Sequence, residues 1–223
     1  MKKDNGNYII AVDGPAGSGK SSIAKLIARH LDFLYIDSGA MYRCVALYML
    51  KNKLMGLRGE KLKKHLKKIK IKFIKKSNKQ HIFLNNKDVT KRIRSSAVNS
   101  IVSPVSAIDV VRFEMVKRQK EFARYCSVVM DGRDIGTVVF NDADLKIYLT
   151  ASVEERAKRR EKDLQRLGEK VNMKNLIRQI QERDNYDSSR KISPLSKAND
   201  AIVIDTTLLD ISGVLNRINV FLP

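Results

Sequence analysis

The first segment that could carry chemistry lies near the start of the chain. Residues 14–21 read GPAGSGKS and match the pattern G-x-x-x-x-G-K-[ST]. In such a P-loop, glycines let backbone N–H groups close around phosphate oxygens, the lysine neutralises the β- and γ-phosphates, and the hydroxyl ligates Mg²⁺. We therefore expect ATP as phosphoryl donor and Ser21 as the metal ligand. The predicted ATP-binding residues of this loop are Gly14, Pro15, Ala16, Gly17, Ser18, Gly19, Lys20, Ser21 and Ser22.

The flanking segments supply the context that this motif requires. Tyr8–Asp13 is an apolar run that reads as a buried strand, and Ser21–His30 carries apolar residues at helical spacing. A helix that begins at the loop adds the positive end of its dipole to the phosphate site. The pattern favours an ATP-using phosphotransferase, although kinases, GTPases and motor ATPases all share it.

Three further segments combine arginines with acids at the ends of predicted elements. DSGAMYR (37–43) follows a strand at Leu34–Ile36, GRDIGT (132–137) follows a strand that ends at Asp131, and RDNYDSSR (183–190) follows an amphipathic helix. Arginines in such positions suit bidentate recognition of phosphate. Taken singly, each would be read as an ordinary surface arginine.

The remaining pattern predicts alternating strands and helices, which is typical of an α/β fold. Ser152 and Glu155 form a predicted capping box that opens a helix running to Leu167, with Gly168 as its stop. Between about 53 and 93, alternating apolar residues predict an inserted antiparallel hairpin, and Asn85-Asn86 predicts a further turn. The other expected elements are helices at 40–50, 105–124, 173–180 and from 211, and strands at 127–130, 145–149 and 201–205.

Four segments together resemble one family. GPAGSGKSS (14–22), YIDSGAMYR (35–43), DGRDIGTVVF (131–140) and RDNYDSSRKISPL (183–195) look like the corresponding segments of bacterial cytidylate kinases, which move the ATP γ-phosphate to CMP and dCMP. The resemblance runs from about Tyr8 to Asp205. It implies a P-loop NTPase fold with a five-stranded parallel sheet flanked by helices. It also implies one kinase domain over 1–223, with core 7–52, 94–151 and 200–223, a monophosphate-binding insert at about 53–93 and a helical lid at about 152–190.

The resemblance also implies roles for individual residues, taken position by position. It places Ser38, Arg43, Arg133 and Arg190 on the phosphate of CMP, Ser103, Arg112 and Asp134 on cytosine, and Arg183 and Asp187 on the ribose. It places Lys20, Arg133 and Arg190 in catalysis, and Arg156, Arg159 and Arg160 on ATP. The chemistry of Asp134 agrees, because a carboxylate can accept from the amino group of cytosine, although a loop cap or an ion pair is the plainer interpretation. Asp131, Asp13 and Asp37 all remain candidates for assisting Mg²⁺.

Composition limits the other functions. The net charge is +20, which attracts polyanions, but the lysines of 61–76 read as a solvated surface. We therefore expect no requirement for nucleic acid, while a nucleic-acid-binding P-loop protein and a kinase for UMP or AMP stay as alternatives. No apolar run approaches the roughly 20 residues that span a bilayer. Two cysteines without metal-type spacing indicate a reducing, cytoplasmic setting, and we expect a monomer without a membrane partner.

Overall fold

The computed structural model describes residues 6–76, 79–166, 168 and 171–223. The chain divides into two compact units, Met1–Tyr35 with Phe122–Pro223 and Ile36–Glu121. The second unit is larger than the predicted insert at 53–93 and contains it. The assignment of a single kinase domain with an insert and a lid stays a prediction. Within the described ranges, no helix is both long and apolar enough to cross a membrane.

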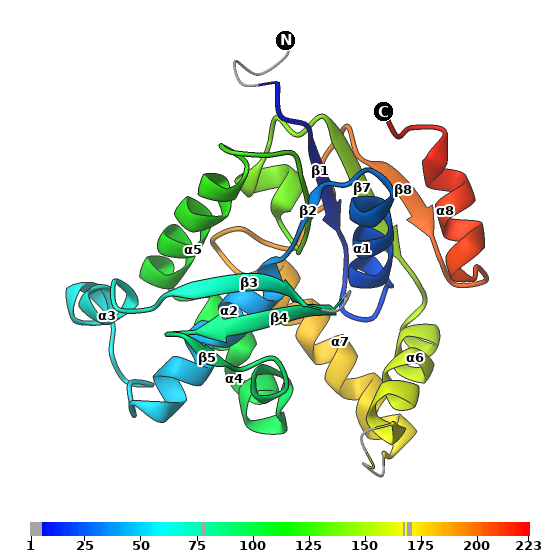
Figure 1. The fold of residues 1–223 in the computed structure, drawn as a ribbon. Helices are drawn as coiled ribbons and strands as arrows, with labels where there is room; N and C mark the ends of the chain where they lie inside the picture. The colour runs from blue at the N-terminus through cyan, green and yellow to red at the C-terminus, as the bar shows by residue number, and fades with distance from the viewer. Residues whose placement is uncertain (1–5, 77–78, 167, 169–170) are drawn as a thin grey trace. The chain divides into compact units, whose positions relative to one another are not determined.

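The first unit is built on a five-stranded parallel sheet with strand order β2-β6-β1-β7-β8, as predicted (Figure 1). The central strand β1 pairs parallel with both β6 and β7, and β7 pairs parallel with β8. The central position explains the continuous apolar sequence of β1, since both faces and both edges are covered. The strands are β1 (Ile9–Asp13), β2 (Leu34–Asp37, which runs into the second unit), β6 (Val128–Asp131), β7 (Leu145–Thr150) and β8 (Ile202–Asp205).

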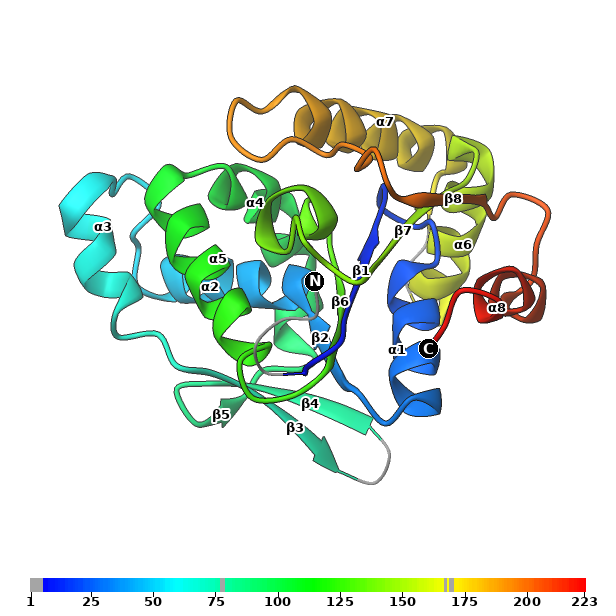
Figure 2. The same ribbon diagram turned by 90° about the horizontal axis from the view of Figure 1, so that it is seen from above.

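Two helices cover one side of this sheet. Figures 1 and 2 show α1 (Lys20–His30) and α8 (Ile211–Asn219) next to each other beside β1 and β7. Ile23 and Ile27 of α1 are buried in one apolar cluster with Val214 and Ile218 of α8 and with residues of the sheet. This core anchors the start of α1, and therefore the loop that precedes it.

The predicted lid region forms two further helices, α6 (Val153–Gln165) and α7 (Met173–Ser189), which pack on each other through a small apolar cluster. Only half of the capping box forms. Ser152 Oγ accepts from the N–H of Glu155, but the Glu155 carboxylate pairs with Arg159 instead of returning to the cap. The predicted helix end at Leu167 lies outside the described residues. The segment from Arg183 does not follow α7 as expected but forms its last turns, because the helix continues to Ser189.

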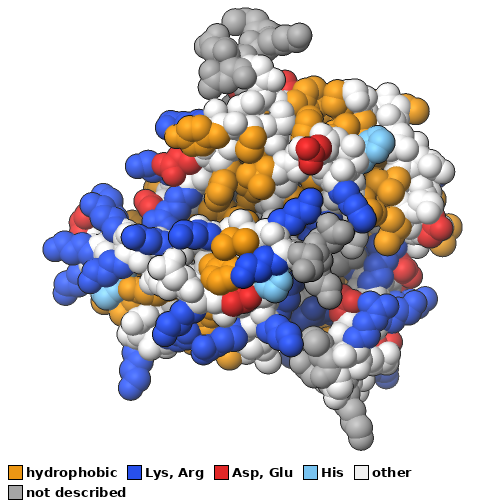
Figure 3. Space-filling model, in the orientation of Figure 1, with side chains coloured by type: hydrophobic (Ala, Val, Ile, Leu, Met, Phe, Trp, Pro, Cys, Tyr) orange, Lys and Arg blue, Asp and Glu red, His pale blue; other side chains and the backbone are white. Residues whose placement is uncertain are grey.

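The second unit contains a helical part and a small sheet. Its helices are α2 (Ser38–Lys51), α3 (Gly59–Leu66), the 3₁₀ turn η1 (Arg92–Arg94), α4 (Ser96–Ser106) and α5 (Asp109–Phe122), whose last residue lies in the first unit. The predicted hairpin is confirmed as β3 (Ile71–Lys76) antiparallel to β4 (Lys79–Leu84). Asn85 and Asn86 both have positive φ, as a two-residue hairpin turn to β5 (Lys87–Asp88) requires. In Figure 3, lysine and arginine side chains crowd the surface over α3 and this sheet.

Sequence reasoning misplaced the start of one helix of this unit and missed two others. The helix expected at 105–124 begins only at Asp109, as α5, because residues 105–106 end a separate helix, α4, that was not expected. Aspartate in a first helical turn favours a new start over continuation. The helix α3 was not expected, because lysines hide its two buried residues, Leu62 and Leu66, which lie one turn apart.

Candidate active site

The P-loop connects the carboxyl end of β1 to the first turn of α1. Three of its glycines have positive φ, at 142° for Gly14, 81° for Gly17 and 88° for Gly19. A Cβ on Gly14 would also lie 1.9 Å from the carbonyl oxygen of Leu149, so that position admits only glycine. Gly19 is the N-cap of α1 and has no side chain to cap its first N–H groups. A helix start of this kind suits phosphate binding.

Lys20 is 5% exposed, and its ammonium group donates to the carbonyl oxygen of Pro15 at 2.5 Å and to Ser18 Oγ at 3.3 Å. Burial, with a smaller contribution from Arg133, holds the pKa of Lys20 well below its usual range. An anion beside this lysine would oppose both effects by stabilising the charged form.

The structure separates the three acids that the sequence leaves open. Asp131 Oδ2 accepts from the hydroxyl of Ser21 at 2.6 Å, and its Oδ1 accepts from the hydroxyl of Tyr35 at 2.8 Å. Asp13 instead accepts from the backbone N–H groups of Ile135 and Gly136. Asp131 is the carboxylate bonded to Ser21, the predicted metal ligand. Sequence reasoning missed Tyr35, although it is the first residue of the matched segment 35–43.

The third acid, Asp37, belongs to the second unit and has structural partners of its own. It is the N-cap of α2, where Oδ1 accepts from the N–H of Ala40 at 2.8 Å. Its other oxygen lies 3.3 Å from Arg94 Nη2. Both carboxylate oxygens are thus used in holding the start of α2.

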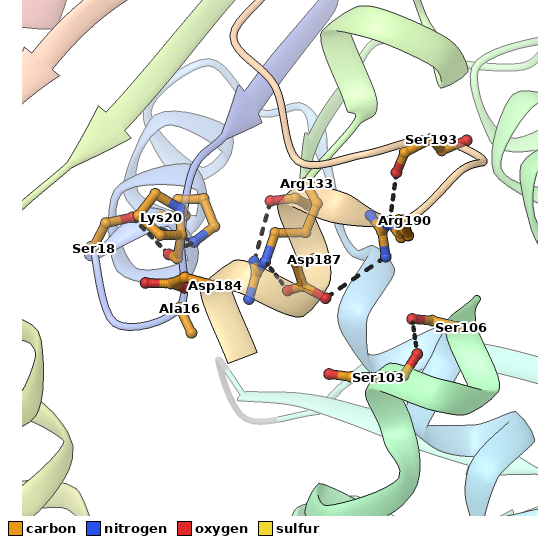
Figure 4. A network of polar contacts seen from close by, with 12 residues as sticks. Ala16, Ser18, Lys20, Ser103, Ser106, Arg133, Asp184, Asp187, Arg190 and Ser193 are labelled. Atoms are coloured by element: carbon orange, nitrogen blue, oxygen red, sulfur yellow. Dashed lines mark hydrogen bonds and ion pairs between the residues drawn. The ribbon is translucent and has the colours of Figure 1, made fainter. Parts of the chain in front are cut away.

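Three of the predicted site residues form one ion-pair network at the end of α7 (Figure 4). Asp187, which is 3% exposed, lies 3.1 Å from Arg133 Nε and 3.7 Å from Arg190 Nη1. Arg190 Nε also donates to the carbonyl oxygen of Ser193 at 2.6 Å. The network joins the loop after β6 to the end of α7. Asp134 is buried next to Arg133 in the chain, and Arg183 lies one turn before Asp187.

The predicted lid arginines already bind protein groups. Arg156 is 4% exposed and donates to the carbonyl oxygens of Ala151 and Ala16 and to Asp184, so it ties α6 to both the P-loop and α7. Arg159 pairs with Glu155 and donates to Thr206. Arg160 lies half-buried on the same helix. Sequence reasoning missed Asp184. A signal was available, because Asp184 follows Arg183 within the matched segment 183–195.

The second unit holds the other predicted nucleotide ligands, on α2, α4 and α5. Ser38 is buried at the first residue of α2, and Arg43 Nε donates to Asn99 Oδ1 of α4 at 3.4 Å. Ser103 is half-buried in the last turn of α4, where its carbonyl oxygen accepts from Ser106 Oγ at 2.8 Å (Figure 4).

Arg112, on α5, is 2% exposed and donates from Nε to the carbonyl oxygen of Ser106 at 3.1 Å. Its guanidinium also lies 5.0 Å from the ring centroid of Tyr42, close enough for a cation–π contact. Sequence reasoning missed Tyr42 and Ser106, although Tyr42 lies within the matched segment 35–43.

The parallel sheet, the glycine loop and the buried lysine define a P-loop NTPase fold, as predicted. A solved structure of an uncharacterized protein from Eubacterium ventriosum shares this fold, with a TM-score of 0.51 at 13% identity over 97% of this chain and 98% of that one.

Sequence comparison gives the family. The cytidylate kinase family model matches residues 10–221. A protein of Leuconostoc mesenteroides named cytidylate kinase is 47% identical over 95% of each chain. Another of that name, from Bacillus thuringiensis, is 47% identical over 94% of this chain and 93% of its own. The chain belongs to the cytidylate kinase family, and it is a kinase.

Proposed function

We propose that the protein transfers the γ-phosphate of ATP to CMP and dCMP, giving ADP with CDP or dCDP, by direct in-line transfer assisted by Mg²⁺. One observation carries the proposal: the P-loop and the Arg133–Asp187–Arg190 network lie in the same compact unit. Arg133 is also near enough to lower the pKa of Lys20. Cationic groups near a transferring phosphoryl group stabilise the charge that develops in the transition state.

Ser21 and Asp131 would hold the metal. Both offer oxygen atoms, which Mg²⁺ prefers, and the two side chains are already in contact. The described residues contain no group of three or more His, Cys, Asp or Glu side chains that could hold a metal. This agrees with an ion that takes most of its ligands from phosphates and water. Mg²⁺ held there would neutralise part of the charge on the ATP phosphates.

Lys20 and the backbone N–H groups of the P-loop would bind the donor triphosphate. Arg156, Arg159 and Arg160 are proposed as further ATP ligands on the strength of the family pattern. The contacts of Arg156 with Ala16 and Asp184 support an added role in holding the P-loop backbone. Closure of α6 and α7 over the donor would exclude water and so suppress hydrolysis.

The proposed acceptor ligands divide by the part of CMP that they would contact. The phosphate is assigned to four cationic or hydroxyl side chains, the cytosine to a carboxylate with two donors, and the ribose to one arginine and one aspartate. These are Ser38, Arg43, Arg133 and Arg190, then Asp134, Ser103 and Arg112, then Arg183 and Asp187. No general base is required, because the acceptor phosphate is already ionised at neutral pH.

An ADP-release assay with CMP, dCMP, UMP, AMP and GMP, with and without added DNA, tests the proposal. We expect CMP and dCMP to be preferred and DNA to have no effect, in line with a monomer that requires neither nucleic acid nor a membrane. The described cysteines, Cys44 and Cys126, are both free thiols, which supports the proposed reducing, cytoplasmic setting. Preference for another monophosphate would refute the acceptor assignment.

Two variants sharpen the test. Lys20→Ala should abolish transfer while circular dichroism stays that of the parent. Asp134→Asn should weaken CMP use by about 5–150-fold, the equivalent of the roughly 1–3 kcal/mol lost at a buried polar mismatch. CMP use should weaken because the asparagine amide would present a donor to the cytosine amino group, which is itself a donor. The KM for ATP should change much less, since Asp134 is proposed to contact only the acceptor. Equal CMP kinetics in Asp134→Asn and the parent would show that Asp134 does not read the base.

A further inference from the structure

The loop that carries Arg133 and Asp134 is attached to β1 at two points. On one side, the N–H of Gly132 donates to the carbonyl oxygen of Val12 at 3.0 Å. On the other, both carboxylate oxygens of Asp13 are used: the N–H of Ile135 donates to Oδ1 at 2.9 Å, and the N–H of Gly136 donates to Oδ2 at 2.7 Å. Only Arg133 and Asp134 lie between the two attachments.

The second attachment is also the N-terminus of a short helix. Ile135–Val139 forms a π-helical turn whose N-cap is Asp134, and the Asp134 side chain forms no capping hydrogen bond. Asp13 supplies the acceptor for the first N–H groups from a different strand. The Asp134 carboxylate therefore does not cap this helix, and the alternative interpretation of Asp134 as a loop cap does not fit the geometry.

Asp13 is a buried acid. It is 5% exposed, and its position directly precedes Gly14, the first residue of the P-loop. Removing a carboxylate from water costs free energy unless its hydrogen bonds compensate. The space around it is also filled, since a Cβ on Gly136 would lie 3.4 Å from Asp13 Oδ2 and 3.1 Å from the Lys146 side chain. A buried acid that forms two backbone hydrogen bonds at this point holds the loop in one conformation.

We propose that Asp13 is a positioning residue for the acceptor nucleotide. It holds the backbone of residues 132–136 in place, and thereby orients Arg133 toward the phosphate of the acceptor and Asp134 toward its base. The inference rests on the proposed function, because the roles of Arg133 and Asp134 do. It gives the residue directly before the ATP-binding loop a role in positioning the second substrate.

The test replaces the acid without changing its size. Asp13→Asn offers one carbonyl oxygen, so one of the two N–H groups of Ile135 and Gly136 loses its acceptor. We expect the KM for CMP to rise by about 5–150-fold and the preference for CMP over UMP to fall, as the loss of one buried hydrogen bond would give. The KM for ATP should change much less. Amide hydrogen exchange at Gly136 should be faster than in the parent.

Asp144→Asn is the matched control. Asp144 Oδ2 also accepts from a backbone N–H of β1, that of Ile9 at 2.7 Å, but at the opposite end of the strand. This variant should keep both KM values. If Asp13→Asn fails to fold, Gly136→Ala is the second variant: it keeps Asp13 and adds a Cβ 3.1 Å from the Lys146 side chain, which must shift or push the backbone of Gly136 away from Asp13. Its KM for CMP should rise while its KM for ATP changes much less, and an unchanged KM for CMP would refute the positioning role.

The outcomes separate this inference from the proposed function. If the parent does not prefer CMP, the proposed function fails and this inference fails with it. If the parent prefers CMP while a folded Asp13→Asn keeps the KM for CMP and the base preference, only the positioning role is refuted. An equal rise in both KM values would also refute it, because Asp13 would then act on the P-loop as a whole.

Discussion

The hydroxyl of Ser21 donates a hydrogen bond of 2.6 Å to Asp131 Oδ2, linking the start of α1 to the end of β6. The two residues are far apart in the sequence and adjacent at the carboxyl edge of the sheet. In open parallel sheets this edge is where ligands bind. Their contact gives a direct way to test the metal proposal.

Asp131→Asn should raise the Mg²⁺ concentration needed for half-maximal activity by about 10–100-fold, as loss of a group that orients or neutralises a metal commonly does. Activity measured across a magnesium titration gives this value. Tyr35→Phe is the control, since it removes a different hydrogen bond to Asp131 and leaves the carboxylate group in place. A similar magnesium dependence in Asp131→Asn and Tyr35→Phe would argue against a role for the Asp131 charge.

Asp187→Ala should destabilise the fold by about 3–5 kcal/mol, because it leaves the cationic side chains of Arg133 and Arg190 without their buried counter-ion. Urea unfolding monitored by circular dichroism gives the free energy. Glu182→Ala, on the same helix, removes an exposed ion pair with Arg178 and should cost less than about 1 kcal/mol. Equal losses in the two variants would mean that the buried network contributes little.

Stability should depend on pH through Asp13. Burial raises the pKa of Asp13 to about 7, and Asp134 adds to the rise, although two backbone hydrogen bonds and Lys20 oppose it. In an unfolded chain an aspartate titrates near pH ~4. The pKa of Asp13 is higher in the folded state than in the unfolded state. The contribution of Asp13 to the free energy of unfolding is therefore fully present below about pH 4 and is lost as the pH rises through about 7. Because asparagine does not titrate, Asp13→Asn should lose more stability relative to the parent at about pH 5 than at about pH 8, as judged by Tm. A pH-independent difference in Tm would contradict the raised pKa.

Affinity for nucleic acid should be weak and should not affect catalysis. Lysines and arginines far outnumber acids between residues 53 and 94, and those of 61–76 that the structure describes are exposed. Binding from such a surface comes from counterion release, so it should be indifferent to sequence and fall steeply with salt. Fluorescence anisotropy with DNA and RNA between low and physiological salt gives the affinity. Micromolar or tighter binding at physiological salt, or a kinase rate that rises with nucleic acid, would revive the nucleic-acid alternative.

Much of the fold and the family could be predicted from the sequence. The P-loop is a local pattern that depends on glycines, a lysine and a hydroxyl at set spacing. Residues 14–21 were therefore sufficient to predict it. The parallel strands were visible as apolar runs because buried strands need no polar face. Elements defined by few apolar residues were harder to predict. Leu62 and Leu66 alone mark α3 among lysines, and the break between α4 and α5 depends on packing as well as on Asp109.

Partners of the polar side chains were decided only by the tertiary structure. Asp13, Asp37 and Asp131 each end an apolar strand, so the local sequence cannot distinguish them. In the structure Asp13 accepts from the N–H groups of a loop, Asp37 caps the start of a helix, and Asp131 accepts from the hydroxyl of Ser21. The physical reason is that a carboxylate accepts from whichever donors the fold brings within about 3 Å. For Asp13 and Asp131 the donors come from parts of the chain far away in the sequence, which a linear pattern does not connect, whereas the backbone donor to Asp37 lies only three residues further on.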